Sequence, residues 1–278
     1  MDTRIRKYAA ILSSFIYRNR YKKTRLDDYA NIEKNNEAWY VKYSVIAHSG
    51  GGIDGRIKTN SKESWQYAYE NGTRVFDADL SFTRDNVIVL RHEWSDDLDQ
   101  ENISEDRIPN YKEFMQTPIL RKYHPMSIFD VIDFMKKHED VYVACDFKDG
   151  IEILEKLIST FRENSCTELF DRVIISLYDY ADYDQAKRLY DFKNYAIRQY
   201  EDLPHNYYEL CAFCLKERIP VCMVTRNYIK EGDRFRILTR RGITVFVATV
   251  NDLGRYKKYR KKGVGGIVSD HLKQNDLR

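Results

Sequence analysis

The sequence predicts an α/β fold, a single (β/α)₈ TIM barrel, and three observations support this prediction. Its 278 residues lie just above the length of about 250 residues that is typical of such a barrel. From Tyr43 onward, short β-branched or aromatic runs alternate with longer segments of helical period, as in a parallel sheet with crossover helices. Eight such runs occur, which is the number that closes the barrel.

The predicted elements follow one another without an interrupting linker. Several helices open with a capping residue, such as Ser127 and Asn251, as helix N-termini commonly do. The expected strands span residues 43–48, 74–80, 141–147, 173–177, 195–200, 221–225, 244–250 and 266–269. The expected helices span residues 61–71, 127–138, 151–163, 183–192, 206–217 and 252–262.

Two segments depart from this repeat. An acidic and polar insertion after strand 2, residues 93–126, follows a short additional strand at 87–91. Connections of this length tend to be lids or decorations, and the composition favours neither. The N-terminal extension, residues 1–40, holds an apolar run of about ten residues between basic clusters, whereas a membrane span takes about 20. We expect a basic helix packed on the barrel domain, residues 41–278, with peripheral contact to anionic lipid as the alternative.

The composition is that of a soluble globular protein, with 43% hydrophobic and 32% charged residues. A net charge of +3 gives no reason to expect a nucleic-acid partner, and it does not repel an anionic phosphodiester. The five cysteines are odd in number and mostly lie in apolar runs, which favours reduced core cysteines and a cytoplasmic location. Cys211 and Cys214 have no second pair nearby, so we interpret them as packing residues.

Ionisable residues gather where the predicted strands end, and active sites of parallel barrels lie at these carboxyl ends. His48 ends the first strand, Asp77 and Asp79 share one side of the second, and Asp146 and Lys148 repeat that spacing at the third. A buried carboxylate loses much of its hydration energy unless a cation compensates for it. Three aspartates at adjacent strand ends therefore predict a divalent metal ion, and oxygen-only ligation favours Mg²⁺ or Ca²⁺.

Two histidines are candidates for acid and base, because imidazole exchanges protons near neutral pH. They are His48 and His92, which follows the additional strand. The other histidines fall in loops or at helix ends, where solvated or capping histidines are common, and they are assigned no role. These are His124, His138, His205 and His271.

Several short motifs occur in order along the chain. They are Ala47-His48, TNSKES at 59–64, VFDADL at 75–80, TRD at 83–85, VLRHEW at 89–94, TVN at 249–251 and GVGGIVSD at 263–270. This series resembles the glycerophosphodiester phosphodiesterase family over roughly residues 43–270. Several motifs in the right order are more specific than any one of them alone.

The resemblance implies metal-dependent hydrolysis of a small-molecule or lipid-derived glycerophosphodiester to an alcohol and glycerol phosphate. Two alternatives stay open: cyclisation of a phospholipid headgroup, and a catalytically impaired barrel that binds a phosphodiester polymer. The resemblance also implies roles for individual residues, namely His48 and His92 as catalytic acid and base, Asp77, Asp79 and Asp146 as metal ligands, and Lys148 as a phosphate contact.

The chain departs from the family pattern at several of these positions. The family more usually has Glu where Asp77 and Asp146 stand. An arginine commonly follows the first histidine, where this chain has Ser49, so the usual fork-shaped phosphate donor is absent from that position. Ala248 stands where the family often has tryptophan, which implies a wider substrate pocket.

Other residues are expected to take over these functions. Backbone N–H groups of Gly50 and Gly51, or the guanidinium of Arg198, are the expected replacements for the phosphate donor. The alternative for the glycines is a flexible turn without a binding role. Trp94 is expected to form part of the pocket wall, with core packing as the alternative. Glu93 is expected either to orient His92 or to be a surface charge.

Overall fold

Eight parallel strands close into a barrel in the computed structural model, which describes residues 25–100, 103–199, 207–230 and 235–277. Neighbouring strands pair in chain order, and the first strand pairs with both the second and the last. This closure confirms the predicted fold class and all eight predicted strands. The strands are β1 (Val45–Ala47), β2 (Val75–Phe82), β4 (Tyr142–Phe147), β5 (Val173–Leu177), β6 (Asn194–Gln199), β7 (Val221–Thr225), β8 (Thr244–Ala248) and β9 (Gly266–Ser269).

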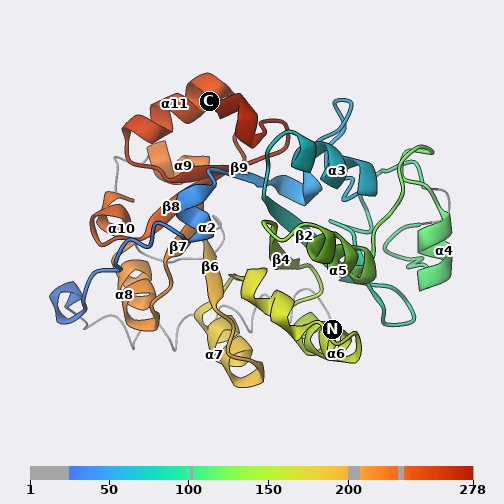
Figure 1. Ribbon diagram of the computed structural model, residues 1–278, viewed down its shortest axis with the longest axis horizontal. Coiled ribbons are helices and arrows are strands. Elements are labelled where there is room, and N and C mark those ends of the chain that lie inside the picture. Colours follow the sequence, from blue (N-terminus) through green and yellow to red (C-terminus); the bar gives the residue numbers. More distant parts are fainter. Residues whose placement is uncertain (1–24, 101–102, 200–206, 231–234, 278) are drawn as a thin grey trace.

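Helices surround the strands (Figure 1). The longer ones, at the positions where the sequence predicts helices, are α3 (Lys62–Glu70), α5 (Ile128–Lys137), α6 (Ile153–Glu163), α7 (Tyr180–Leu189), α8 (Tyr207–Glu217) and α11 (Leu253–Lys261). Short elements complete the described chain: α2 (Trp39–Lys42), α4 (Tyr111–Gln116), α9 (Arg226–Lys230), α10 (Arg236–Arg240) and the 3₁₀ turns η1 (Leu26–Asp28), η2 (His48–Gly50), η3 (Thr167–Arg172) and η4 (Gln274–Leu277).

Two predicted helix starts are wrong, and capping explains both. α7 begins before the predicted residue 183, because the Asp179 side chain accepts a hydrogen bond from the N–H of Ala181 and starts the helix there. α11 is capped by Asp252 rather than by Asn251, since the Asp252 carboxylate accepts the N–H of Arg255 at 2.6 Å. The Asn251 side chain is instead used in the site described below.

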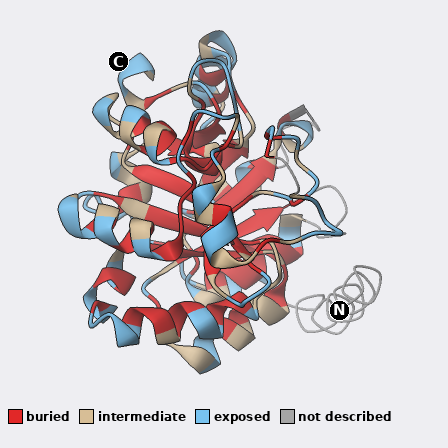
Figure 2. Ribbon diagram, turned by 90° about the vertical axis from the view of Figure 1, so that its right-hand side faces the viewer, coloured by how far each residue is buried: buried red, intermediate tan, exposed pale blue. Residues whose placement is uncertain are grey.

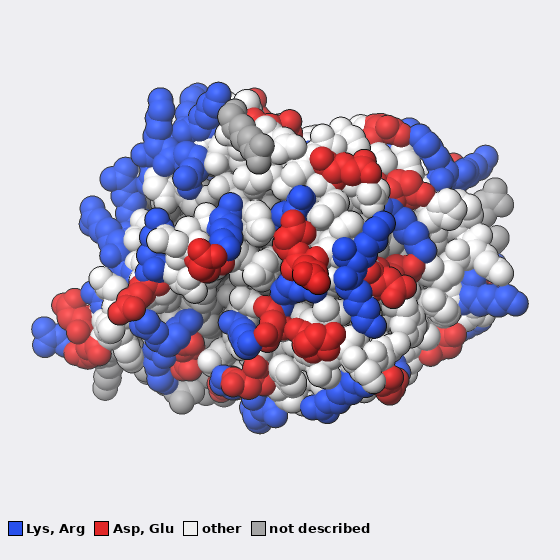
Figure 3. Space-filling model, viewed as in Figure 1, with Lys and Arg blue, Asp and Glu red and all other residues white. Residues whose placement is uncertain are grey.

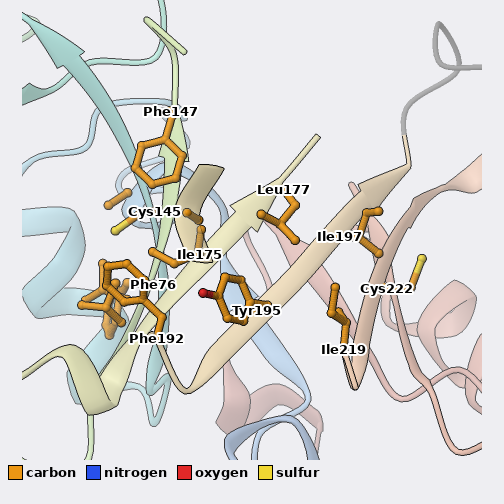
Figure 4. Packing of buried hydrophobic residues seen from close by; sticks show 14 of the residues in the cluster. Phe76, Cys145, Phe147, Ile175, Leu177, Phe192, Tyr195, Ile197, Ile219 and Cys222 are labelled. Carbon is orange, nitrogen blue, oxygen red and sulfur yellow. The ribbon is translucent and has the colours of Figure 1, made fainter. Parts of the chain in front are cut away.

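The outward faces of the strands pack under the helices and form most of the core. In Figure 2 the strands are buried along their length, whereas exposed residues lie on the outer helix faces and loops. Figure 4 shows Cys145, Ile175, Ile197 and Cys222 among the side chains that pack between strands and helices. All five cysteines are buried and form no disulfide, which confirms their interpretation as core residues.

The inward faces divide the barrel into an apolar floor and a polar upper layer. Ile46, Val75, Ala144 and Phe246 belong to the floor, and Trp39 from α2 packs on Phe246 with ring centroids 5.7 Å apart. The end of the predicted N-terminal extension is therefore part of the barrel core. The expected basic helix of this extension lies in residues 1–24, outside the described residues.

The insertion forms a small lateral subdomain with its own core, on the side of the molecule where Figure 1 shows α4. The additional strand is confirmed as β3 (Ile88–Leu90), which runs antiparallel to the end of β2. Val89, Trp94 and Phe114 pack together beneath α4. The subdomain thus extends the barrel laterally, and it carries His92 at its junction with β3.

The surface mixes both signs of charge, with Lys and Arg side chains gathered over α11 (Figure 3). Exposed residues of this basic cluster include Arg255, Lys257, Lys258 and Lys261. Among the described helices, none combines the length and apolarity that crossing a bilayer requires.

Candidate active site

A cavity of about 580 Å³ opens at the carboxyl ends of the barrel strands, directly above the apolar floor. Side chains alternate along a strand, so residues two positions beyond the floor layer again point inward. This register places Asp77 two residues after Val75 on β2, and Arg198 two residues after Ala196 on β6. The cavity is lined by His48, His92, Asp146, Lys148, Tyr178, Arg198, Thr225, Arg226, Asn227, Ala248, Thr249 and Val268.

The three predicted metal ligands come together at the base of this cavity. Asp77 and Asp79 are 0% exposed and Asp146 is 3% exposed. One carboxylate oxygen from each lies within 4.8 Å of the others. Asp79 and Asp146 are opposite one another in the β2–β4 register, which explains why two distant sequence positions form one cluster.

Two cations and two neutral donors hold these carboxylates. The Lys148 ammonium lies 2.9 Å from Asp79 and 2.8 Å from Asp146. Asn60 donates its amide N–H to Asp79 at 2.7 Å, and the Tyr178 hydroxyl donates to Asp146. Lys148, Asn60 and Tyr178 therefore hold the cluster from three surrounding strand ends and turns.

The Arg198 guanidinium reaches the acidic cluster from the opposite wall. Its two terminal nitrogens face the two oxygens of Asp77, and one of them also lies 3.3 Å from Asp146. Arg198 is 3% exposed, so this is a buried ion pair. Lys148 and Arg198 both lie beside the cavity as predicted, although here both are bound to carboxylates.

Burial and the neighbouring charges affect the three aspartates differently, and Asp146, like Asp79 below, has a lowered pKa because Arg198 and Lys148 outweigh its burial. Burial raises the pKa of Asp77 above its ordinary value, and the charges of Asp146 and Asp79 add to this despite Arg198. For Asp79, burial acts in the same direction, but the charges of Lys148, His92 and His48 outweigh it and hold the pKa below its ordinary value. Asp77 is therefore the carboxylate whose negative charge is least compensated.

This donor set fits a divalent cation. Carboxylate oxygens are the hard ligands that Mg²⁺ and Ca²⁺ prefer. The three carboxylates face two permanent cations, Lys148 and Arg198, which leaves negative charge in a buried environment. A bound ion held by Asp77, Asp79 and Asp146 would compensate for it.

His48 is oriented by a carboxylate from the last strand. Its Nδ1 lies 2.6 Å from the carboxylate of Asp270, which follows β9, and Asn251 donates to the same carboxylate at 2.7 Å. Burial alone would lower the pKa of His48, but the bond to Asp270 and the charges of Asp77 and Asp79 raise it above its ordinary value. His48 is therefore protonated more readily than an ordinary imidazole.

His92 is oriented by a carboxylate within its own loop. Its Nδ1 lies 2.9 Å from Asp96, whose other oxygen is 3.4 Å from the Lys58 ammonium. Glu93 is exposed, and Asp96 is the carboxylate bonded to the ring. The His48 and His92 rings lie 6.2 Å apart, nearly perpendicular, and both line the same cavity.

Three of the predicted binding residues lie away from the described lining of the cavity. Gly50 and Gly51 form the turn after β1, where a Cβ on Gly50 would lie 2.3 Å from Trp65. The Gly51 N–H donates to the carbonyl of His48, which favours a packing role for this turn. Trp94 packs against Phe114 in the insertion, in agreement with its alternative interpretation.

Sequence reasoning missed Asp270, Asp96 and Tyr178 as site residues. Asp270 belongs to the GVGGIVSD motif. Its position directly after the last predicted strand could have identified it as a site residue. Asp96 is separated from His92 by one helical turn of sequence, but it lies in a loop whose shape the pattern does not predict. Tyr178 directly follows β5, and strand-end aromatic residues are too common to single it out.

A family model described as the glycerophosphoryl diester phosphodiesterase family matches residues 51–274. The chain belongs to this family. It is accordingly a phosphodiesterase, an enzyme of the hydrolase class. A comparison with curated proteins found no significant match.

Solved structures of similar fold come from several bacteria. The glycerophosphodiester phosphodiesterase of Thermotoga maritima matches with a TM-score of 0.64 and 19% identity, over 82% of this chain and 94% of that one. A glycerophosphoryl diester phosphodiesterase of Parabacteroides distasonis matches with a TM-score of 0.66 and 16% identity, over 91% and 90%. An Oleispira antarctica phosphodiesterase, solved with the product sn-glycerol-3-phosphate, matches with a TM-score of 0.65 and 16% identity, over 86% and 96%.

Proposed function

We propose that this protein hydrolyses a glycerophosphodiester to an alcohol and glycerol phosphate with a divalent cation at Asp77, Asp79 and Asp146. The observation that supports this most directly is the position of two imidazoles on one cavity, with ring centroids 6.2 Å apart. Each ring bonds a carboxylate through Nδ1, which fixes its orientation and leaves Nε2 for proton transfer. An acid and a base on one cavity can serve the two proton transfers of phosphodiester cleavage.

The surroundings of the histidines suggest a division of roles. Because its pKa is raised, His48 is the better candidate for the acid that protonates the departing alcohol. His92 then acts as the base that takes a proton from the attacking water. Asp270 and Asp96 act through these rings as positioning residues, since they hold the tautomer and stabilise the protonated form.

Asp77, Asp79 and Asp146 would hold the cation, and the phosphoryl group would bind beside it at Lys148. When bound, a divalent cation supplies Lewis-acid stabilisation of the charge on the phosphoryl oxygens. The Lys148 ammonium lies beside Asp79 and Asp146 and also lines the cavity, so it can donate to a phosphoryl oxygen. Asn60 and Tyr178 keep Asp79 and Asp146 in place through hydrogen bonds.

The cavity supports a small-molecule substrate. Its volume of about 580 Å³ lies within the range of about 300–1,000 Å³ usual for small-molecule sites, and the Oleispira antarctica neighbour was solved with sn-glycerol-3-phosphate. The Ala248 side chain lies on the cavity wall, as expected for a wider pocket. We infer a reducing compartment, the cytoplasm, from the five buried unpaired cysteines.

The test is turnover of defined glycerophosphodiesters, such as glycerophosphocholine and glycerophosphoethanolamine, followed by phosphorus NMR. We expect release of glycerol phosphate that stops with a chelator and returns when Mg²⁺ or Ca²⁺ is restored. A stable cyclic phosphate product would favour the cyclising alternative instead. Binding of these compounds without any turnover, with either ion present, would favour the catalytically impaired barrel.

A further inference from the structure

The Arg198 guanidinium lines the cavity and is bonded to Asp77, which does not line it. Arg198 lies on β6, and β6 is separated from β2 by β4 and β5 in the ring of strands, so its side chain crosses the barrel interior to reach Asp77. Both oxygens of Asp77 face a terminal nitrogen of the guanidinium, one of them at 3.4 Å. The second contact, to Asp146 at 3.3 Å, holds the guanidinium between two of the three carboxylates.

A guanidinium and a divalent cation compete for this position. The three aspartates bring one oxygen each within 4.8 Å of the others, which is the geometry for a shared ion. An ion there needs a lone pair of Asp77, and the fork of Arg198 is directed at both of its oxygens. Two positive charges so close together also repel one another strongly where water is excluded. Ion binding at Asp77 therefore favours withdrawal of the guanidinium.

The released guanidinium has a second anion within reach. Arg198 lines the same cavity as His48, His92 and Lys148, where the phosphoryl group is proposed to bind. Ser49, directly after His48, has no guanidinium to offer there. Arginine binds a phosphoryl group with the same two-pronged geometry that it uses for a carboxylate.

The charge balance changes sign with the ion. Among these five side chains, three carboxylates against Lys148 and Arg198 leave one net negative charge, which disfavours a phosphodiester anion. Adding a divalent cation turns this into one net positive charge, which a phosphodiester neutralises. The carboxylates and Arg198 are buried, so this electrostatic difference is screened less than it would be on the surface.

We propose that Arg198 is an internal counter-ion of Asp77 that a divalent cation displaces, so that ion binding transfers the guanidinium from Asp77 to the phosphoryl group. Ion and phosphate therefore bind cooperatively, and Arg198 lowers the affinity for the ion alone. This inference rests on the divalent ion of the proposed function. Its tests measure binding of the ion and of phosphate, whereas the test of the proposed function measures turnover. Either proposal can therefore be contradicted without the other.

The first test is calorimetric titration of the full-length protein with Mg²⁺ alone. Arg198→Gln removes the competing fork, and we expect it to bind Mg²⁺ more tightly than the wild type by a factor on the order of ten, within the usual range of coupling between two sites. Arg226→Gln is the matched control, because it removes a positive charge from the wall of the same cavity, where an exposed group is screened. Mg²⁺ affinity of Arg198→Gln no higher than that of Arg226→Gln would overturn the proposal.

Arg198→Lys covers the case in which Arg198→Gln does not fold. Lysine keeps the positive charge but has no fork, so it holds Asp77 less well and should also bind Mg²⁺ more tightly than the wild type. Circular dichroism with and without Mg²⁺ establishes that each variant is folded. Unchanged or weaker Mg²⁺ binding by a folded Arg198→Lys contradicts displacement of the guanidinium.

The second test measures the cooperativity directly with inorganic phosphate and Mg²⁺. In the wild type and in Arg226→Gln, Mg²⁺ should strengthen phosphate binding by a factor on the order of ten. In Arg198→Gln a measurable part of this gain should disappear, because the guanidinium that responds to the ion is gone, while the two charges that the ion adds still favour phosphate. Full cooperativity in Arg198→Gln would show that Lys148 or the ion alone binds the phosphate, which excludes the proposed transfer.

Discussion

His48 and His92 differ in their surroundings, although each bonds a carboxylate through Nδ1. The carboxylate of His48 comes from the far end of the chain, and Asn251 holds it in turn. The carboxylate of His92 lies four residues away and is shared with Lys58. The pair is therefore asymmetric at the scale of single residues, as two opposite proton-transfer roles require.

Replacing either histidine should nearly abolish turnover. Proton transfer contributes on the order of 10²–10⁴-fold to rate, so we expect kcat to fall by about that factor in His48→Ala and in His92→Ala. Thermal unfolding should change little, because both rings lie at the cavity surface. His138→Ala is the control, since His138 lies at the end of α5. Full activity in either cavity variant would refute its assignment.

The Asp270 carboxylate should set the alkaline limit of activity. The proposed acid works only while His48 is protonated, so kcat falls as the pH rises through its pKa. Asp270→Asn removes a negative charge that raises this pKa, and the alkaline limb of the kcat profile should move to lower pH. The neighbouring variant His271→Gln should leave the limb in place. An alkaline limb that stays or moves to higher pH in Asp270→Asn would contradict the acid role of His48.

Residue types and strand-end positions were enough to select both histidines, the three aspartates and Lys148 as candidates, and their roles stay predictions. Periodicity brings such residues to one end of a barrel, and the structure finds them there. The same reasoning could not separate Gly50 and Trp94, which pack against Trp65 and Phe114, from residues that line the cavity. The surroundings of these residues depend on the paths of loops. Loops have no residue periodicity from which the direction of a side chain can be predicted.

At the scale of elements, the junction between β3 and the insertion positions His92. The buried Arg91 side chain donates to the carbonyls of Glu93 and Asp96 at 2.8 and 2.6 Å and to the Gln100 side chain at 2.8 Å. These bonds define the path of the loop that holds His92 and its partner Asp96. Burial lowers the pKa of Arg91 to about 10, which still leaves it charged at neutral pH.

Arg91→Met should loosen this loop and reduce activity without unfolding the barrel. Hydrogen bonds to a charged group contribute about 1.5–3 kcal/mol each, and all three would be lost. We expect faster amide hydrogen exchange in residues 93–100, a lower kcat, and unchanged exchange in β4 and β5. Arg84→Met, which removes an exposed ion pair with Glu113, is the control. Wild-type exchange in the loop of Arg91→Met would show that other contacts hold it.

At the scale of the whole molecule, the apolar floor of the barrel contributes to stability, and the polar layer above it carries the residues of the candidate active site. Trp39 closes the amino-terminal end against Phe246 and the other inward apolar side chains. The polar layer above it carries three buried carboxylates that repel one another, which costs stability. An apolar floor and continuous outer core offset this cost, so the site can hold three buried carboxylates.

Trp39→Ala should therefore destabilise the protein strongly while leaving the chemistry of the site in place. Loss of a buried aromatic side chain typically costs about 3–5 kcal/mol, and Trp39 is 2% exposed. Phe129→Ala is the matched control, because Phe129 lies on α5 and is 39% exposed. It should change the free energy of unfolding by no more than about 0.5 kcal/mol. Denaturant unfolding measures both, and a cost below about 1 kcal/mol for Trp39→Ala would contradict its role as the floor.

The sequence by itself determined the closed barrel, the order of its strands and the residue types at their carboxyl ends. Period and strand order are local properties, and they suffice because parallel strands bring their ends to one face. Only the tertiary structure decided which of these residues touch: Arg198 with Asp77, Asp270 with His48, and Asp96 with His92. Such pairs depend on side-chain reach across the barrel and on loop paths, and no regularity of the chain encodes either.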